Sequence, residues 1–223
     1  MIKLSEEKIK NITEYIFYKN RKYTNKEEYD LIFMSGDGVE KQIINKLIEL
    51  KKSNLITNKT KFIISKSHTV IDPEFNEVVD SLVNLQKELK KYSFDNEIIV
   101  PKNIISTKVY EELKDLFSNC KNILIMVKDF TRRRQFLTIK KMGFDTNCFE
   151  WYGLVDNRNI SEDDWYKTEE GINQVLKEFL NIKDIEIVKK LNIEQELKEL
   201  CLIIKDNPKQ YIKYKNSVDY ILR

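Results

Sequence analysis

Lys121–Gly143, with the sequence KNILIMVKDFTRRRQFLTIKKMG, is the stretch that decides the fold. Its apolar run from Asn122 to Val127 is typical of a strand that is buried on both faces of a sheet. The run leads into a helix whose expected end is Gly143, since glycine is the residue that most often caps a helix C-terminus. A buried strand that continues directly into a helix predicts one unit of a parallel sheet.

The same alternation of strand and helix patterns recurs on both sides of this stretch. Further strands are expected at residues 30–34, 61–65, 97–100 and 147–151, with helices between them, and Ser5 is expected to cap an N-terminal helix. Right-handed crossovers leave few arrangements, of which the strand order 3-2-1-4-5 is favoured. The predicted fold is α/β, a three-layer α/β/α Rossmann-like parallel sheet of about five strands.

The pattern of the chain changes after Trp151, where strand signals stop and helical periodicity takes over. Ser161 precedes an amphipathic helix, and further helices are expected at about 193–206 and from Pro208 to the end. We therefore predict two parts. Residues 1–155 form the Rossmann-like domain with its N-terminal helix, and residues 156–223 form a helical C-terminal extension packed on that domain.

Composition excludes several classes of protein. The net charge of +3 is too small to indicate a nucleic-acid or membrane partner, and no apolar run approaches the roughly 20 residues of a membrane span. The three cysteines have no CxxC spacing, which is typical of free thiols in a reducing compartment, so a cytoplasmic location is expected. His68 is the only histidine, and no metal site is predicted.

Three consecutive arginines, Arg132 to Arg134, open the helix that ends at Gly143. A helix N-terminus already carries partial positive charge, so each added cation there costs roughly 0.3–1 kcal/mol unless a negative group lies opposite. In the predicted strand order, the carboxyl ends of the first and fourth strands flank the point where a ligand binds such sheets. The arginine run thus either faces an anionic ligand or is a solvated surface with one arginine paired to Asp129 or Glu77. Asp129 in turn is either a general base or the partner of one of these arginines.

The chain resembles the YdcF-like family, a domain of unknown function related to the SanA and ElyC envelope proteins. Four places carry this resemblance: Asp30–Val39, Phe62–His68, Glu77 and Lys128–Arg134. They match, in order, the family's first strand and turn, its second strand and nearby histidine, a helical glutamate, and the turn after its fourth strand. The matching region covers roughly residues 12–152.

The resemblance implies a ligand site at the carboxyl ends of the strands. Two places depart from the family pattern: the turn Ser65–Ser67 lacks paired glycines, and Pro101 stands where the family has an acid. Asp37 also fits a simpler role as a helix cap. The implied site residues are Ser35, Gly36, Asp37, Ser65, His68, Glu77, Ser106, Thr107, Asp129, Thr131 and Arg134.

Two functions follow from these residues. The first is a binding protein or enzyme for a small anionic, nucleotide-derived ligand such as S-adenosylmethionine, captured by Arg134 and by N–H groups of the turn at Gly36. The second is a degenerate, non-catalytic member of the family that acts as a protein-interaction module. The sequence names neither a reaction nor an oligomeric state.

Overall fold

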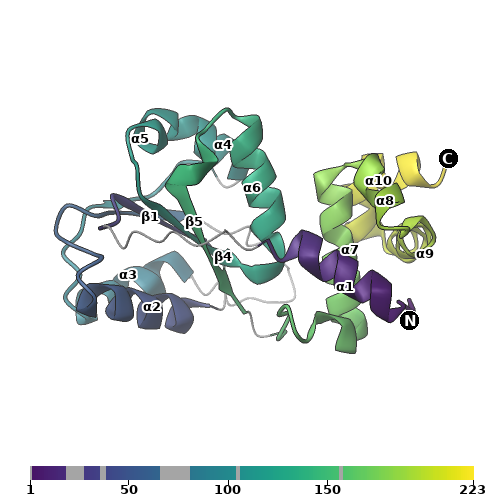
Figure 1. Ribbon diagram of the computed structural model, residues 1–223, viewed down its shortest axis with the longest axis horizontal. Helices are drawn as coiled ribbons and strands as arrows, with labels where there is room; N and C mark the ends of the chain where they lie inside the picture. The colour runs from purple at the N-terminus through teal and green to yellow at the C-terminus, as the bar shows by residue number, and fades with distance from the viewer. Residues whose placement is uncertain (1, 19–27, 36–38, 66–80, 104–105, 156–157) are drawn as a thin grey trace. The chain divides into compact units, whose positions relative to one another are not determined.

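The computed structural model describes residues 2–18, 28–35, 39–65, 81–103, 106–155 and 158–223 (Figure 1). The chain forms two compact units. The sheet unit comprises Lys19–Asp129 and Thr138–Asn157, and the helical unit comprises Met1–Tyr18, Phe130–Leu137 and Arg158–Arg223. The N-terminal helix, which the sequence analysis assigned to the sheet domain, therefore belongs with the C-terminal helices. The observed division also differs from the expected single boundary after residue 155.

The sheet unit contains a parallel sheet whose described strands follow the order β3-β2-β1-β4-β5, which confirms the predicted order. All four pairings are parallel, and β1 pairs with β2 on one side and with β4 on the other. The strand bounds are β1 Leu31–Ser35, β2 Lys61–Ser65, β3 Ile98–Ile99, β4 Ile123–Lys128 and β5 Phe149–Leu154.

One face of the sheet is covered by α2 (Glu40–Lys52) and α3 (Ser81–Lys91). Side chains alternate between the two faces of a strand, so every second residue contributes to this layer. The shared core contains Ile32, Met34, Phe62, Ile64, Leu124 and Met126 from the strands, and Ile43, Leu47, Leu85 and Leu89 from the helices.

The opposite face is covered by aromatic packing around α4 (Ser106–Glu112) and α5 (Lys114–Ser118). The ring of Phe33 on β1 lies 5.6 Å from that of Tyr110 and 6.3 Å from that of Phe117. Among the helices expected between the strands, the sequence pattern predicts a single one from about Ser106 to Ser118, but the helix is interrupted at Leu113. With helices on both faces, the sheet unit has the expected three-layer α/β/α arrangement (Figure 1).

The stretch Lys121–Gly143 has the predicted form. After β4 comes a short 3₁₀ helix, η1 (Asp129–Thr131), and then α6 (Arg132–Lys141). Gly143 has φ +80°, and its N–H donates to the carbonyl of Lys140 at 3.1 Å. This left-handed conformation is the one that favours glycine after a helix, so the predicted cap is confirmed. A second 3₁₀ helix, η2 (Thr146–Cys148), precedes β5.

The helical unit combines α1 (Glu6–Ile16) with four C-terminal helices. Ser5 caps α1 as predicted, accepting a hydrogen bond from the N–H of Lys8 at 3.3 Å. The C-terminal helices are α7 (Glu169–Ile182), α8 (Ile185–Lys190), α9 (Glu194–Lys205) and α10 (Pro208–Ile221). Pro208 occupies the first turn of α10 as expected, where its missing N–H costs no hydrogen bond.

The start of α7 differs from the sequence prediction. The helix begins at Glu169, and its cap is Thr168, whose hydroxyl accepts from the N–H of Gly171 at 3.0 Å. Ser161 instead bonds Asp164 through its hydroxyl, in the turn that leads into η3 (Trp165–Lys167). The expected N-cap was therefore placed seven residues too early.

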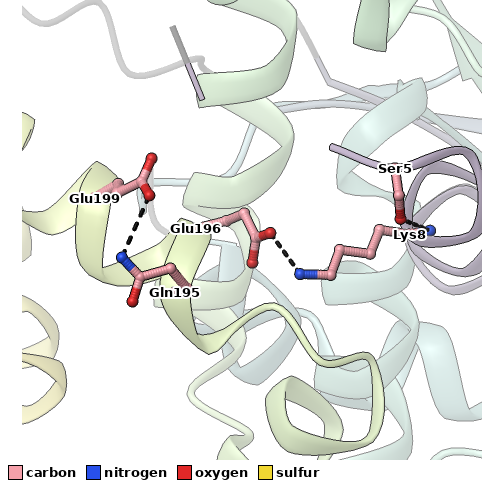
Figure 2. A network of polar contacts seen from close by, with 5 residues as sticks. All are labelled: Ser5, Lys8, Gln195, Glu196 and Glu199. Atoms are coloured by element: carbon pink, nitrogen blue, oxygen red, sulfur yellow. Dashed lines mark hydrogen bonds and ion pairs between the residues drawn. The ribbon is translucent and has the colours of Figure 1, made fainter. Parts of the chain in front are cut away.

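A single apolar core joins α1 to the C-terminal helices. Ile12, Ile16, Trp165, Val175 and Leu197 are all fully buried in it. Figure 2 shows an ion pair at its edge, in which the Lys8 ammonium of α1 meets the Glu196 carboxylate of α9 at 2.5 Å. The chain's two ends therefore meet in one unit because its first helix completes the core of its last ones.

All three cysteines are free thiols, and burial raises the pKa of Cys120 and of Cys201 to about 11. In the described part of the chain, no helix has both the length and the apolar character needed to cross a bilayer.

We predict that Gly171→Ala destabilises the protein, although alanine favours a helix by about 1 kcal/mol over glycine. A Cβ at position 171 would lie 2.1 Å from the carbonyl oxygen of Trp165, which is backbone and cannot turn aside. Overpacking of this kind costs about 2–3 kcal/mol. Urea unfolding measures the loss in free energy.

The control is Gly143→Ala, where a Cβ would meet no atom within 4 Å and only the positive φ is unfavourable. Its expected cost is about 1–2 kcal/mol. An unchanged or raised stability of Gly171→Ala would contradict the close approach.

Candidate functional site at the carboxyl ends of the strands

The strand order reverses at β1, because β2 and β3 lie on one side of it and β4 and β5 on the other. In open parallel sheets, ligands bind beyond the carboxyl ends of the strands at such a reversal. The relevant ends are those of β1 and β4, with the end of β2 adjacent. These ends lie where the sequence analysis expected the site.

Two of the predicted site residues, Ser35 and Ser65, are brought together at this edge. They are the last residues of β1 and β2 and are direct neighbours in the parallel register. In-register neighbours point to the same face of a sheet, and Ser35 shares its face with Phe33, two residues earlier. Both hydroxyls are therefore on the face that α4 and α5 cover. Ser65 is buried and Ser35 is half-buried.

The start of α4 belongs to the same face, since Tyr110 of this helix packs on Phe33. Ser106 is the first residue of α4, and the predicted site residue Thr107 follows it with an exposed side chain. The helix comes directly after β3 in the chain, so it begins at the carboxyl edge of the sheet. Ser35, Ser65 and Thr107 thus share one face and one edge.

The opposite face at the same edge is closed by a side chain that the sequence analysis did not consider. Gln42, in the first turn of α2, donates its amide NH₂ to the carbonyl of Val155 and accepts from the Val155 N–H at 3.1 Å. Val155 directly follows β5, and β4 lies between β1 and β5 in the sheet. The paired bonds therefore span the carboxyl end of β4. No sequence signal marks Gln42, because its partner is a backbone group 113 residues away.

Asp129 and Thr131 lie in η1, directly after β4. The Asp129 side chain is buried, with 8% of the residue exposed, and Thr131 is half-buried. Asp129 belongs to the sheet unit, whereas Thr131 and Arg134 belong to the helical unit. Four other predicted site residues lie outside the described residues: Gly36, Asp37, His68 and Glu77.

Arg134 is held by a carboxylate of the helical unit. Its Nε donates to Oε2 of Glu178 at 2.8 Å, and the Glu178 side chain is only 3% exposed. Asn181 donates to the other oxygen of Glu178 at 3.4 Å. Burial is the main cause that raises the pKa of the neighbouring Tyr214, and the charge of Glu178 raises it further. The chain itself thus supplies an anion for Arg134, which the sequence analysis sought at Asp129 or Glu77.

Glu178 does have a sequence signal, which the sequence analysis did not use. It lies among the buried apolar positions of α7, next to Phe179 and three residues after Val175. Acids are almost never fully buried unless they are paired, so an acid at such a position indicates a cationic partner elsewhere in the chain.

Arg133 is held mainly by aromatic rings. Its guanidinium lies 4.6 Å from the ring centres of both Tyr15 and Tyr18, and its Nε donates to the carbonyl of Tyr15 at 2.7 Å. Burial lowers the pKa of Arg133. Arg132 is itself buried, with 8% exposed. Arg133 and Arg134 therefore both have partners within the helical unit.

Comparisons of the chain with models of protein families, with curated proteins and with solved structures found no match. Among the described residues, no group of three or more histidines, cysteines and acids is placed to hold a metal ion.

We predict that Arg134→Met destabilises the helical unit, because the buried Glu178 carboxylate loses its cationic partner. Removing one member of a buried pair costs about 3–5 kcal/mol, and the 31% exposure of the Arg134 side chain places this variant nearer 2–3 kcal/mol. Chemical denaturation measures the loss.

Two further variants test the cause. Lys141→Met, on an exposed position of the same helix, is expected to change stability by less than about 0.5 kcal/mol. Adding Glu178→Gln to Arg134→Met is expected to restore part of the loss, since the uncompensated charge is gone. Equal costs for Arg134→Met and Lys141→Met would argue against a stabilising ion pair.

Proposed function

We propose that the protein binds a small anionic or nucleotide-derived molecule at the carboxyl ends of β1 and β2, on the face covered by α4. The observation that carries this proposal is the in-register placement of Ser35 and Ser65 beside the reversal point of the sheet. Two adjacent hydroxyls can donate to phosphate or carboxylate oxygens and accept from ribose hydroxyls.

Two further features support a ligand on this face. Thr107 adds a third, exposed hydroxyl from the first turn of α4. The Gln42–Val155 bonds occupy the opposite face at the same edge, so a ligand at this edge would lie on the α4 face. The buried Asp129 carboxylate lies directly after β4 at the same edge of the sheet, and a carboxylate can accept hydrogen bonds from ribose hydroxyls. S-adenosylmethionine is one molecule with these groups.

We also propose that the protein is a member of the YdcF-like family and is located in the cytoplasm. The three free thiols support a reducing compartment, and the strand order agrees with the fold that the family resemblance implies. Capture of an anion by Arg134 stays a prediction. The bond to Glu178 is made by Nε, which is one of the several donors of the guanidinium.

We predict that a ligand of this class raises the melting temperature of the protein. Binding to the folded state at one hundred times the dissociation constant contributes about 2.7 kcal/mol, which for a chain of this size is about 5–10 °C. A thermal-shift panel of nucleotides, sugar nucleotides and S-adenosylmethionine measures the effect. The double variant Ser35→Ala/Ser65→Ala is expected to lose most of the shift.

The matched control is Ser53→Ala, an exposed serine at the end of α2, which is expected to keep the full shift. Arg134→Met in the same panel tests the ligand role of that arginine, after correction for its lower stability without ligand. A panel in which no molecule shifts the wild-type protein argues against a ligand of this class.

A second candidate function, a non-catalytic interaction module, is favoured by a different observation. Four large apolar side chains of α9 and α10 are exposed in the helical unit: Leu202, Ile203, Ile212 and Tyr220. Exposed apolar surface of this kind is a feature of protein-interaction sites when it is contiguous. This function is preferred if the ligand panel is negative for the wild-type protein.

A further inference from the structure

The helical unit contains a groove between α7 and α10 that differs in chemistry from the strand-end site. Two adjoining cavities make up this α7–α10 groove, one of about 320 Å³ and one of about 360 Å³. They share Leu180, Lys183, Asn216 and Ser217 as lining residues. Volumes of this size are typical of sites for small molecules.

The first cavity is mainly apolar. Phe179 and Val188, both buried, form its walls together with the half-buried Ile185 and Ile221. Its acidic lining residue, Asp184, caps α8 by accepting from the N–H of Ile187 at 3.2 Å. An aliphatic chain would find a complementary surface here, since burial of apolar area is favourable by about 25 cal/mol per Å².

The second cavity is cationic. Lys183, Lys213 and Lys215 line it, and no carboxylate does. None of the three forms an ion pair with any residue in the described ranges. Burial is the main cause that lowers the pKa of Lys177 on α7, and the positive charge of Lys213 lowers it further. An excess of positive charge therefore surrounds this end of the groove.

A hydrogen bond between two helices lies where the two cavities adjoin. The Ser217 hydroxyl of α10 donates to the Leu180 carbonyl of α7 at 3.0 Å, which ties the two helices together at this border. Asn181, which bonds Glu178 of the Arg134 pair, lines the cationic cavity. The groove therefore has a fixed frame with one apolar end and one cationic end.

We propose that the α7–α10 groove binds an amphipathic anion, an aliphatic chain that ends in a carboxylate or phosphate group. The chain lies in the apolar cavity between Phe179 and Val188. The head group lies near Lys183, which lines both cavities, and within the field of Lys213 and Lys215. Lysine suits this role as a mobile point charge that reaches an anion from a flexible stem. The proposal concerns a second site, independent of the strand-end ligand.

The test is calorimetric titration of the full-length protein with decanoate and with decyl phosphate, each below its micelle concentration. Saturable binding of one molecule is expected for at least one of the two, and the stronger of them identifies the head group. Decanol and decyltrimethylammonium, which have the same chain without the negative charge, are expected to bind at least about tenfold more weakly.

Variants separate the two ends of the groove. Lys183→Gln/Lys213→Gln is expected to weaken binding of the anionic probe about tenfold or more and to leave decanol unaffected. Asn216→Trp, at an exposed position shared by both cavities, is expected to block all the probes by filling the groove. Lys189→Gln/Lys190→Gln, two exposed lysines of α8 outside both linings, is the matched control and is expected to bind as the wild type.

Several outcomes would overturn the proposal. One is an absence of saturable binding by both anionic probes. Another is equal binding of the neutral, cationic and anionic chains, or an equal loss in the control variant. Binding of phosphatidylglycerol vesicles, or of an acidic peptide, without binding of the free probes would assign the groove to a membrane surface or to a protein instead.

Discussion

The pairing of β1 on both of its sides is the constraint on which the sheet unit depends. A strand buried on both faces must bond all its N–H and C=O groups to other strands, since no water reaches them. β2 and β4 supply these partners from opposite directions along the chain. The reversal of strand order at β1, and with it the position of the strand-end site, follows from this pairing. The placement of Ser35 beside Ser65 follows from the same register.

In the helical unit, the corresponding constraint is electrostatic. The run of three arginines at the start of α6 would be unfavourable if no negative or π-electron-rich groups lay nearby. The Glu178 carboxylate forms an ion pair with Arg134, and the faces of the Tyr15 and Tyr18 rings contact the guanidinium of Arg133. The first part of α6 therefore belongs to the helical unit, while Thr138–Lys141 belongs to the sheet unit. One helix therefore contributes residues to both compact units.

Local sequence patterns predicted most of the strands and helices, whereas contacts between residues far apart in the chain could not be predicted. β1, β2 and β4 were recognised because each is a continuous apolar run, and the end of α6 was recognised because Gly143 can adopt a positive φ. The partners of Arg134 and Gln42 lie 44 and 113 residues away in the chain, and no local pattern links them. The start of α7 was misplaced because Ser161 and Thr168 can both cap a helix, and in the structure the Ser161 hydroxyl bonds Asp164 while the Thr168 hydroxyl caps α7. The grouping of α1 with the C-terminal helices could not be predicted for the same reason, since the core in which α1 is buried is formed by residues at the far end of the sequence.

The close approach of Gly171 to the carbonyl of Trp165 has an evolutionary consequence. Any relative that keeps this turn must keep glycine at the position, because every other side chain places a carbon where the oxygen lies. Thr168 is under a similar restriction, since its hydroxyl bonds the Gly171 N–H. A threonine and a glycine three residues apart are thus the side-chain requirements of this turn, whereas Trp165 contributes only its backbone carbonyl to the close approach.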